Sequence, residues 1–183
     1  MTTRKTGIAL GGGGARGFAH LGVLQALKEK GIQGDMFCGT SAGSVVGAFM
    51  AAGEEPLKVF DIMKKHSFFD FAKMTLPSMG LFNLDNLAAH LEKHLRFKKI
   101  EELPKPLIVT VADMCAGKVK YLETGPLAKA VQASSSIPVL FSPVAMDGTL
   151  YSDGGVFDNL PYRPLEASCD FIYAIHISPI RPV

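Results

Sequence analysis

The sequence has no tryptophan, only three cysteines and no long run of apolar residues. Its apolar runs fall well short of the roughly 20 residues that a membrane-spanning helix requires, so we expect no such helix. The first six residues carry two basic side chains and lead directly into a short apolar run and a glycine-rich loop. That arrangement is not the pattern of a signal peptide, and we expect none.

The three cysteines lie far apart in the sequence, and none belongs to a Cys-x-x-Cys pair. Cys38, Cys115 and Cys169 therefore offer no metal-ligand spacing, and we expect them to be reduced residues of the core. Reduced cysteines are typical of cytoplasmic proteins. The sequence thus predicts a cytoplasmic protein without a metal site.

The chain also has little excess charge, since 19 basic and 17 acidic residues give a formal net charge of +2. The basic residues are spread along the sequence, which predicts no nucleic-acid partner. Hydrophobic residues make up 48% of the chain, and the mean hydropathy is +0.22. In 183 residues this composition predicts a single domain over residues 1–183 with a sizeable core. It leaves the oligomeric state unknown.

Apolar, strand-like runs alternate with stretches of helical periodicity. The strand-like runs are 6–10, 35–38, 107–112 and 171–177. The helical stretches are 18–30, 42–52, 56–66, 84–95 and 126–133. Such alternation predicts an α/β fold with three α/β/α layers and a mostly parallel central sheet. A hairpin turning near Gly117 is expected to add Val119–Leu122 beside the third run.

The most informative stretch places Ser41 in a Gly-x-Ser-x-Gly motif between Gly39 and Gly43. A strand-like run precedes it and a run of small apolar residues follows. A serine at such a strand-to-helix turn is held on a sharp bend with its hydroxyl exposed. The glycines permit the tight turn, and the helix directs its positive end toward the serine. The motif therefore predicts a nucleophilic hydrolase.

Four glycines, residues 11–14, stand between the first strand-like run and the first helix. Backbone N–H groups in such a loop converge on one point and bind an anion, either a phosphate or an oxyanion. Arg16 follows in the first helical turn, where the helix dipole disfavours a cation. A local role for Arg16 and a solvated surface arginine are both open. His20, on the same helix, is expected to have a packing role.

Two Asp-Gly pairs occur late in the chain, and they have different contexts. Asp147-Gly148 separates two short strand-like runs and is a two-residue hairpin signal. Asp153 follows the second of these runs and precedes Gly154 and Gly155, which leave room around its carboxylate. A carboxylate beside a serine can act as its base. No histidine has a matching context, so Asp153 is the candidate.

In this order, the glycine loop, Gly-x-Ser-x-Gly and Asp-Gly-Gly resemble the patatin-like phospholipase family. The segments 133–138 and 141–144 resemble the block upstream of the family's aspartate, and 159–161 resembles the segment after it. The resemblance covers roughly residues 6–180. Family domains usually continue with further helices, so the chain is expected to be either a compact member or one truncated at its C-terminus.

The resemblance implies a serine lipid acyl hydrolase of the phospholipase A or esterase type, with no metal and no cofactor. Its substrate would be a lipid or another ester, with transient contact to a membrane surface. Ser41 would be the nucleophile and Asp153 its partner in a catalytic dyad. The oxyanion element would comprise Gly12, Gly13, Gly14, Arg16 and Gly17. The glycines that support the two motifs would be Gly39, Gly43, Gly154 and Gly155.

Two other functions remain open. Gly12, Gly14 and Gly17 also fit the Gly-x-Gly-x-x-Gly fingerprint of a dinucleotide-binding domain, with Asp35 near the position of a ribose-binding acid. That hypothesis leaves both Gly-x-Ser-x-Gly and Asp-Gly-Gly without a role. A non-catalytic lipid-binding or regulatory module on the same fold is the second alternative. It would have no chemical reason to keep both Ser41 and Asp153.

Residues 67–83 combine many phenylalanine, methionine and leucine side chains with Pro77 and Gly80, which interrupt regular structure. One interpretation is a connection that packs on the core. The other is a mobile lid or a membrane-facing edge of an acyl pocket, because exposed apolar patches mark such sites.

Overall fold

The computed structural model of the chain describes residues 4–65, 73–74 and 82–178. These residues form a seven-stranded sheet with the neighbour order β7-β8-β5-β2-β1-β9, and β6 pairs with β5. The strands of this sheet are β1 Thr6–Leu10, β2 Met36–Thr40, β5 Leu107–Asp113, β6 Lys118–Leu122, β7 Val144–Met146, β8 Thr149–Asp153 and β9 Phe171–Ile175. A separate antiparallel pair consists of β3 Lys73–Met74 and β4 Phe82–Asn83.

The helices follow the strands in alternation, as the periodicity predicts. They are α1 Phe18–Glu29, α2 Ala42–Ala51, α3 Pro56–Met63, α4 Asp85–His94 and α5 Leu127–Ser135. Short 3-10 turns are η1 Gly14–Gly17, η3 Ile100–Glu102, η4 Gly154–Val156 and η5 Arg163–Leu165. The α/β fold class is confirmed, and the expected helices and strands agree with these bounds to within a few residues.

The sheet is mixed. β9, β1, β2 and β5 are mutually parallel, whereas β6, β8 and β7 join as antiparallel strands. The antiparallel strands enter through hairpins. The first hairpin turns at Gly117, whose φ is +63°. The second turns at Asp147 and Gly148, and both of these residues have a positive φ. Two positive φ values in a two-residue loop fit the right-handed twist of the paired strands.

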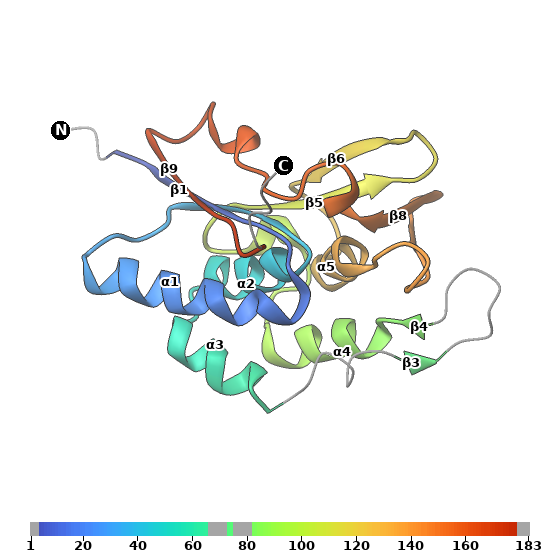
Figure 1. The fold of residues 1–183 in the computed structure, drawn as a ribbon, viewed down its shortest axis with the longest axis horizontal. Helices are drawn as coiled ribbons and strands as arrows, with labels where there is room; N and C mark the ends of the chain where they lie inside the picture. Colours follow the sequence, from blue (N-terminus) through green and yellow to red (C-terminus); the bar gives the residue numbers. More distant parts are fainter. Residues whose placement is uncertain (1–3, 66–72, 75–81, 179–183) are drawn as a thin grey trace.

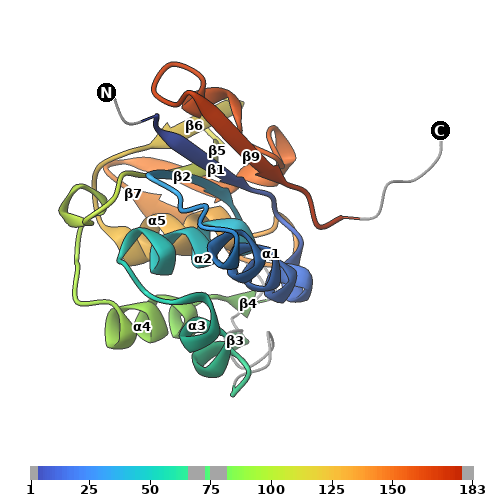
Figure 2. The same ribbon diagram turned by 90° about the vertical axis from the view of Figure 1, so that its left-hand side faces the viewer.

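All five α-helices of the described ranges lie on one side of the sheet (Figure 1). α2 is buried from Gly43 to Ala51, as expected for a helix that is apolar on all sides. Figure 2, turned by 90°, shows α1, α2 and α5 directly under the strands and α3 and α4 farther out. Side chains alternate across each strand, so Ile8 and Leu10 of β1 join the large core on the helical side.

The other face of the sheet has a small apolar cluster of its own. Ala9, Cys38 and Ile108 pack there against Leu165 of η5. Cys38 is therefore a core residue as expected, and burial raises the pKa of its thiol to about 12. Cys115 is exposed, so its assignment to the core was wrong, because it lies in the β5–β6 turn rather than in a strand.

The apolar segment 67–83 lies almost entirely outside the described residues, and both interpretations of it stay predictions. No helix in the described part of the chain is long and apolar enough to cross a membrane.

Candidate active site

Ser41 lies at the junction of β2 and α2 in a strained backbone conformation. Its φ is 53° and its ψ −124°, a region that side-chain-bearing residues rarely adopt and that is found at functional turns. The flanking glycines allow the turn to pack. A Cβ on Gly39 would lie 2.5 Å from Gly43 O, and one on Gly43 would overlap Leu10 O. Both motif glycines are therefore required, because neighbouring backbone atoms lie too close to leave room for a Cβ.

One strand, β5, brings Ser41 and Asp153 together. β2 runs along one edge of β5 as far as the pair Thr40–Thr110. β8 continues along that same edge from the opposite direction, beginning at the pair Val111–Asp153. The two strands thus end at neighbouring positions of β5. Ser41 follows the end of β2, and Asp153 is the last residue of β8, so the two side chains meet in one place.

The Asp153 carboxyl group is buried next to the serine. The whole residue is 6% exposed, and its Oδ1 accepts a hydrogen bond from the Gly155 N–H at 2.8 Å. Burial raises the pKa of Asp153, while hydrogen bonds from the Ser41 hydroxyl and from Gly155 lower it in part. The net shift is upward. An aspartate in this setting is a stronger base than an exposed one, whose pKa is about 3.9.

The C-terminal end of α5 and the residue that follows it hold both residues of the pair in place. Ser134 Oγ accepts a hydrogen bond from the Ser41 N–H at 2.9 Å and donates one to Thr110 O at 2.7 Å. Ser136 O accepts the Asp153 N–H at 2.9 Å. Neither serine was expected in the site from the sequence. The resemblance of 133–138 to a family block was the signal that could have found them.

The glycine loop faces the same cleft. Gly12, Gly13, Gly14 and Arg16 line it together with Ser41 and Asp153, and its volume is about 480 Å³. The remaining lining residues are Ile137, Pro138, Gly155, Val156, Asn159 and Ser178. The predicted nucleophile, its acidic partner and most of the predicted oxyanion loop are thus brought together. Of the supporting glycines, only Gly155 reaches the cleft wall.

The loop residues differ in what their backbone groups can do. The Gly12 N–H donates to Asn159 O at 3.0 Å, so it is not free to meet a substrate. In the described part of the chain, the N–H groups of Gly13 and Gly14 donate to no protein acceptor. Those two groups are the available donors for an anion. Arg16 has a local contact, because its Nε donates to Gly13 O at 3.3 Å.

Gly17 and His20 support the loop from outside the cleft. Gly17 is buried against α2, where a Cβ would lie 3.0 Å from Ala42 Cβ. His20 is fully buried, and its Nε2 lies 2.7 Å from Gly11 O. The ring therefore donates to the carbonyl of the first glycine of the loop, which agrees with the expected packing role.

Asp35 does not fit a ribose-binding role. It precedes β2, and its carboxylate accepts the Thr6 N–H at 2.8 Å at the start of β1. The glycine loop follows the other end of β1. Because the parallel strands are five residues long, about 15 Å separates the two ends. Asp35 is therefore too far from the glycine loop to serve as the ribose-binding acid that the dinucleotide hypothesis requires.

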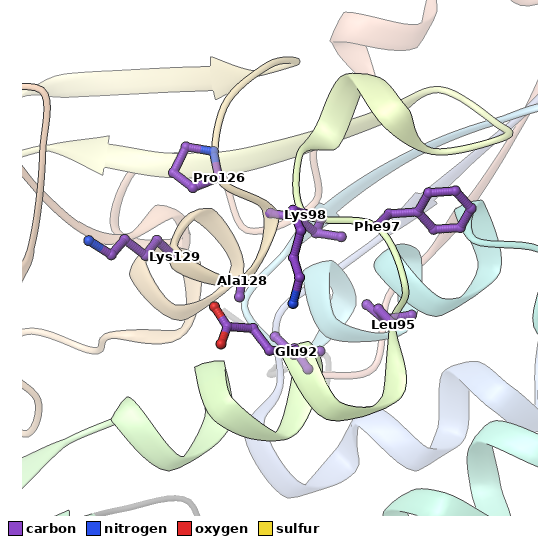
Figure 3. Close-up of a pocket in the computed structure, with 9 residues that line it drawn as sticks. Glu92, Leu95, Phe97, Lys98, Pro126, Ala128 and Lys129 are labelled. Atoms are coloured by element: carbon purple, nitrogen blue, oxygen red, sulfur yellow. The ribbon is translucent and has the colours of Figure 1, made fainter.

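A second, smaller cavity of about 80 Å³ lies between α4 and α5 (Figure 3). Its lining includes Leu91, Leu95, Leu127 and Ala128, with Glu92, Lys98 and Lys129 beside them. None of the predicted site residues lines it. Across the described ranges, no group of three or more His, Cys, Asp or Glu side chains could hold a metal ion.

Residues 8–166 match the family model described as patatin-like phospholipase. Uncharacterised NTE family proteins of Mycobacterium tuberculosis and Mycobacterium bovis are 33% identical over 177 residues, which is 95% of this chain and 49% of theirs. Lysophospholipase nte1 of Aspergillus fumigatus is 31% identical over 184 residues, or 97% of this chain and 12% of that protein. The chain thus spans about half the length of the mycobacterial relatives.

Solved structures agree at the level of the fold. VipD from Legionella pneumophila matches with a TM-score of 0.56 and 21% identity, over 86% of this chain and 47% of that one. ExoU from Pseudomonas aeruginosa, solved with SpcU, matches with a TM-score of 0.51 and 19% identity, over 75% of this chain and 39% of that one. With the family model matching most of its length, the chain belongs to the patatin-like phospholipase family.

Proposed function

We propose that the protein is a serine lipid acyl hydrolase of the carboxylic-ester type. One observation carries this proposal: Ser41 and the buried Asp153 face one cleft, where the Ser41 hydroxyl is near enough to the carboxyl group to lower its pKa in part. Both line a cleft with Gly13 and Gly14, whose N–H groups have no protein acceptor among the described residues. A nucleophile, a base and anion-binding donors around one space are the parts that acyl transfer requires.

In the first half-reaction, Ser41 Oγ bonds to the ester carbonyl carbon while its proton passes to Asp153. The developing oxyanion is stabilised by the N–H groups of Gly13 and Gly14. The C–O bond to the alcohol then breaks, and the alcohol takes the proton from Asp153. In the second half-reaction, a water molecule gives its proton to Asp153 and attacks the acyl group, and Ser41 leaves and regains its proton.

A lipid ester is the substrate class that the relatives support, since one of them is named a lysophospholipase. The pKa of Asp153, raised by burial, supports its role as the base. Even so, a carboxylate is a weak base for a hydroxyl, so the oxyanion donors carry much of the rate. Loss of a single donor of this kind typically costs about 100- to 1,000-fold in turnover.

A fluorophosphonate probe tests the nucleophile directly. We expect one adduct, on Ser41, when the labelled protein is digested and analysed by mass spectrometry, and no adduct in Ser41→Ala. An adduct on a different serine would refute the assignment. If a folded wild-type protein takes no label and hydrolyses no ester, the non-catalytic lipid-binding module becomes the better description.

Two matched aspartate variants test the base. Asp153→Asn is expected to abolish hydrolysis of a short soluble ester, because an amide cannot accept the proton. Asp147→Asn should change activity little, since Asp147 has a φ of 49° at a hairpin tip where Asn is equally suitable. Comparable activity in Asp153→Asn and wild type, with both proteins folded, would rule out the dyad.

A further inference from the structure

Two loops without charged residues, 137–141 and 154–157, edge the cleft that contains Ser41. Ile137 and Pro138 of the first loop and Val156 of the second line its wall. The large apolar side chains that these loops expose are Ile137, Val139, Leu140, Val156 and Phe157. We call these five residues the apolar rim.

The rim is held firmly in its exposed position. Phe141 is buried, and its N–H donates to Ile137 O at 2.8 Å. β4 is hydrogen-bonded to the same loop at two points. The Phe82 N–H donates to Leu140 O, and Phe82 O accepts from the Ser142 N–H. In the second loop, the Phe157 N–H donates to Gly154 O at 3.0 Å. The exposure of these side chains is therefore a feature of ordered loops.

Val139 is the most unusual member of the rim. It is 87% exposed, and its φ is +72°. A β-branched residue in the left-handed region is a genuine outlier, whereas Asn or Gly would adopt that conformation without strain. Strain at an exposed apolar residue contributes nothing to folding. Such strain persists where it is part of a functional site.

The position of the rim restricts what can cover it. A protein seated on both loops would close the mouth of the cleft and exclude substrate. A lipid surface can cover the rim and supply the substrate at the same time. It would also remove from water the apolar area that the rim leaves exposed.

We propose that the apolar rim docks on a lipid surface and places the open cleft against it. Ile137, Val139 and Leu140 of the first loop and Val156 and Phe157 of the second enter the surface. The inference rests on the proposed function, because it assumes that the substrate is a lipid in that surface. It assigns the docking to described residues outside the segment 67–83.

Vesicle binding in the Ser41→Ala background tests the docking without any turnover. The vesicles are of dioleoyl-phosphatidylcholine, and sedimentation gives the bound fraction. Adding Val139→Asn is expected to weaken partitioning about tenfold, the loss of one valine side chain from an apolar phase. Phe157→Asn should act in the same direction from the second loop. Unchanged binding in both variants would overturn the proposal.

A matched control and a melting curve separate docking from folding. Leu57 on α3 is 59% exposed, and α3 lies at the other end of the molecule from the loop after α5 (Figure 1). Leu57→Asn should leave binding unchanged. Val139→Asn should raise the melting temperature by about 2–4 °C, because it relieves strain. A lower melting temperature together with weaker binding would make Val139 a packing residue and refute the docking role.

Hydrolysis of a short soluble ester by the protein with Ser41 intact reports on the proposed function separately. If that hydrolysis is absent while the rim variants still reduce vesicle binding, the acyl hydrolase proposal fails and docking stands. If hydrolysis is present while the rim variants bind vesicles like wild type, docking fails and the hydrolase proposal stands.

Discussion

Ser41 depends on neighbouring hydrogen bonds to stay in its strained turn. Its carbonyl accepts the Ser44 N–H and the Ser44 hydroxyl, at 2.8 and 2.7 Å. Its own N–H donates to Ser134 Oγ, which in turn donates to Thr110 O. Ser134 is fully buried, so water cannot replace this link. A side chain from α5 therefore fixes the backbone of the nucleophile against β5.

We expect Ser134→Ala to lower the turnover of a short soluble ester by about 10- to 100-fold, since small misplacements of a reacting group have effects of this order. The variant leaves two buried backbone groups unpaired, at about 1–3 kcal/mol each. Steady-state kinetics and the rate of fluorophosphonate labelling measure the effect. The loss should fall mainly on kcat rather than on KM, because the lining of the cleft is unchanged.

Ser136→Ala is the matched control for this prediction. Ser136 is just as buried, but its hydroxyl donates only to Gln132 O, and the carbonyl that holds Asp153 belongs to the backbone. The Ser136→Ala variant should lose stability with little loss of the fluorophosphonate labelling rate. Ser134→Thr keeps a hydroxyl and should restore much of the rate. Equal labelling rates in Ser134→Ala and Ser136→Ala would mean that Ser134 has no positioning role.

At the level of elements, the crossing of α2 over β1 depends on a glycine. A Cβ on Gly43 would overlap Leu10 O and lie 2.9 Å from Gly11 O, and neither backbone group can give way without moving the strand. The same contact sets the distance between the nucleophile turn and the glycine loop. A change at Gly43 should therefore affect both the packing of the helix and the shape of the cleft.

We predict that Gly43→Ala lowers the free energy of unfolding by about 1–3 kcal/mol or more, as overpacking typically does. Gly22→Ala is the matched control in another helix, α1. Gly22 is exposed, and nothing lies within 4 Å of a Cβ there. It should stabilise the protein by about 0.5–1 kcal/mol, because alanine is the better helix former. Denaturant unfolding decides, and equal effects of the two substitutions would refute the packing argument.

The elements could be predicted because each carries a local signal. The periodicity of α1, the apolar run of β2 and the Asp147-Gly148 turn are all visible within a few residues of sequence. The placement of β8 beside β5 could not be predicted in this way. Whether β8 joins β5 beyond the end of β2 depends on pairing between residues about 40 positions apart, such as Val111 and Asp153.

At the scale of the whole molecule, the active site is likewise predictable from the sequence only where its residues stand in local motifs. Ser41, Asp153 and the glycine loop stand in recognisable motifs, so the sequence predicts them. Ser134 stands in the 133–138 block, but that block does not say which serine contacts the nucleophile, because the contact forms only when α5 packs against β5 and α2. The Gly12 N–H was expected in the oxyanion element, but it is bonded to Asn159 O, a residue far along the chain. Long-range packing decides these details.

The stability of the whole molecule should depend on pH through His20. Its Nε2 donates to Gly11 O, while its buried Nδ1 has no partner in the described part of the chain. Burial lowers the pKa of His20 from its ordinary value of 6.5, although the bond to Gly11 raises it in part. A proton on Nδ1 would be a buried, unpaired donor next to the glycine loop, so the folded state favours the neutral ring.

The direction in which stability changes with pH follows from proton linkage. Below pH about 6.5, the unfolded chain protonates His20 while the folded chain does not. The stability from the neutral ring is therefore fully present above pH 6.5 and is lost as the pH falls toward the lowered pKa. His20→Gln can still donate to Gly11 O but cannot titrate. Urea unfolding at pH 8 and pH 5.5 should show a smaller loss of stability in His20→Gln than in wild type. An equal loss in both proteins would exclude His20 as the source of the pH dependence.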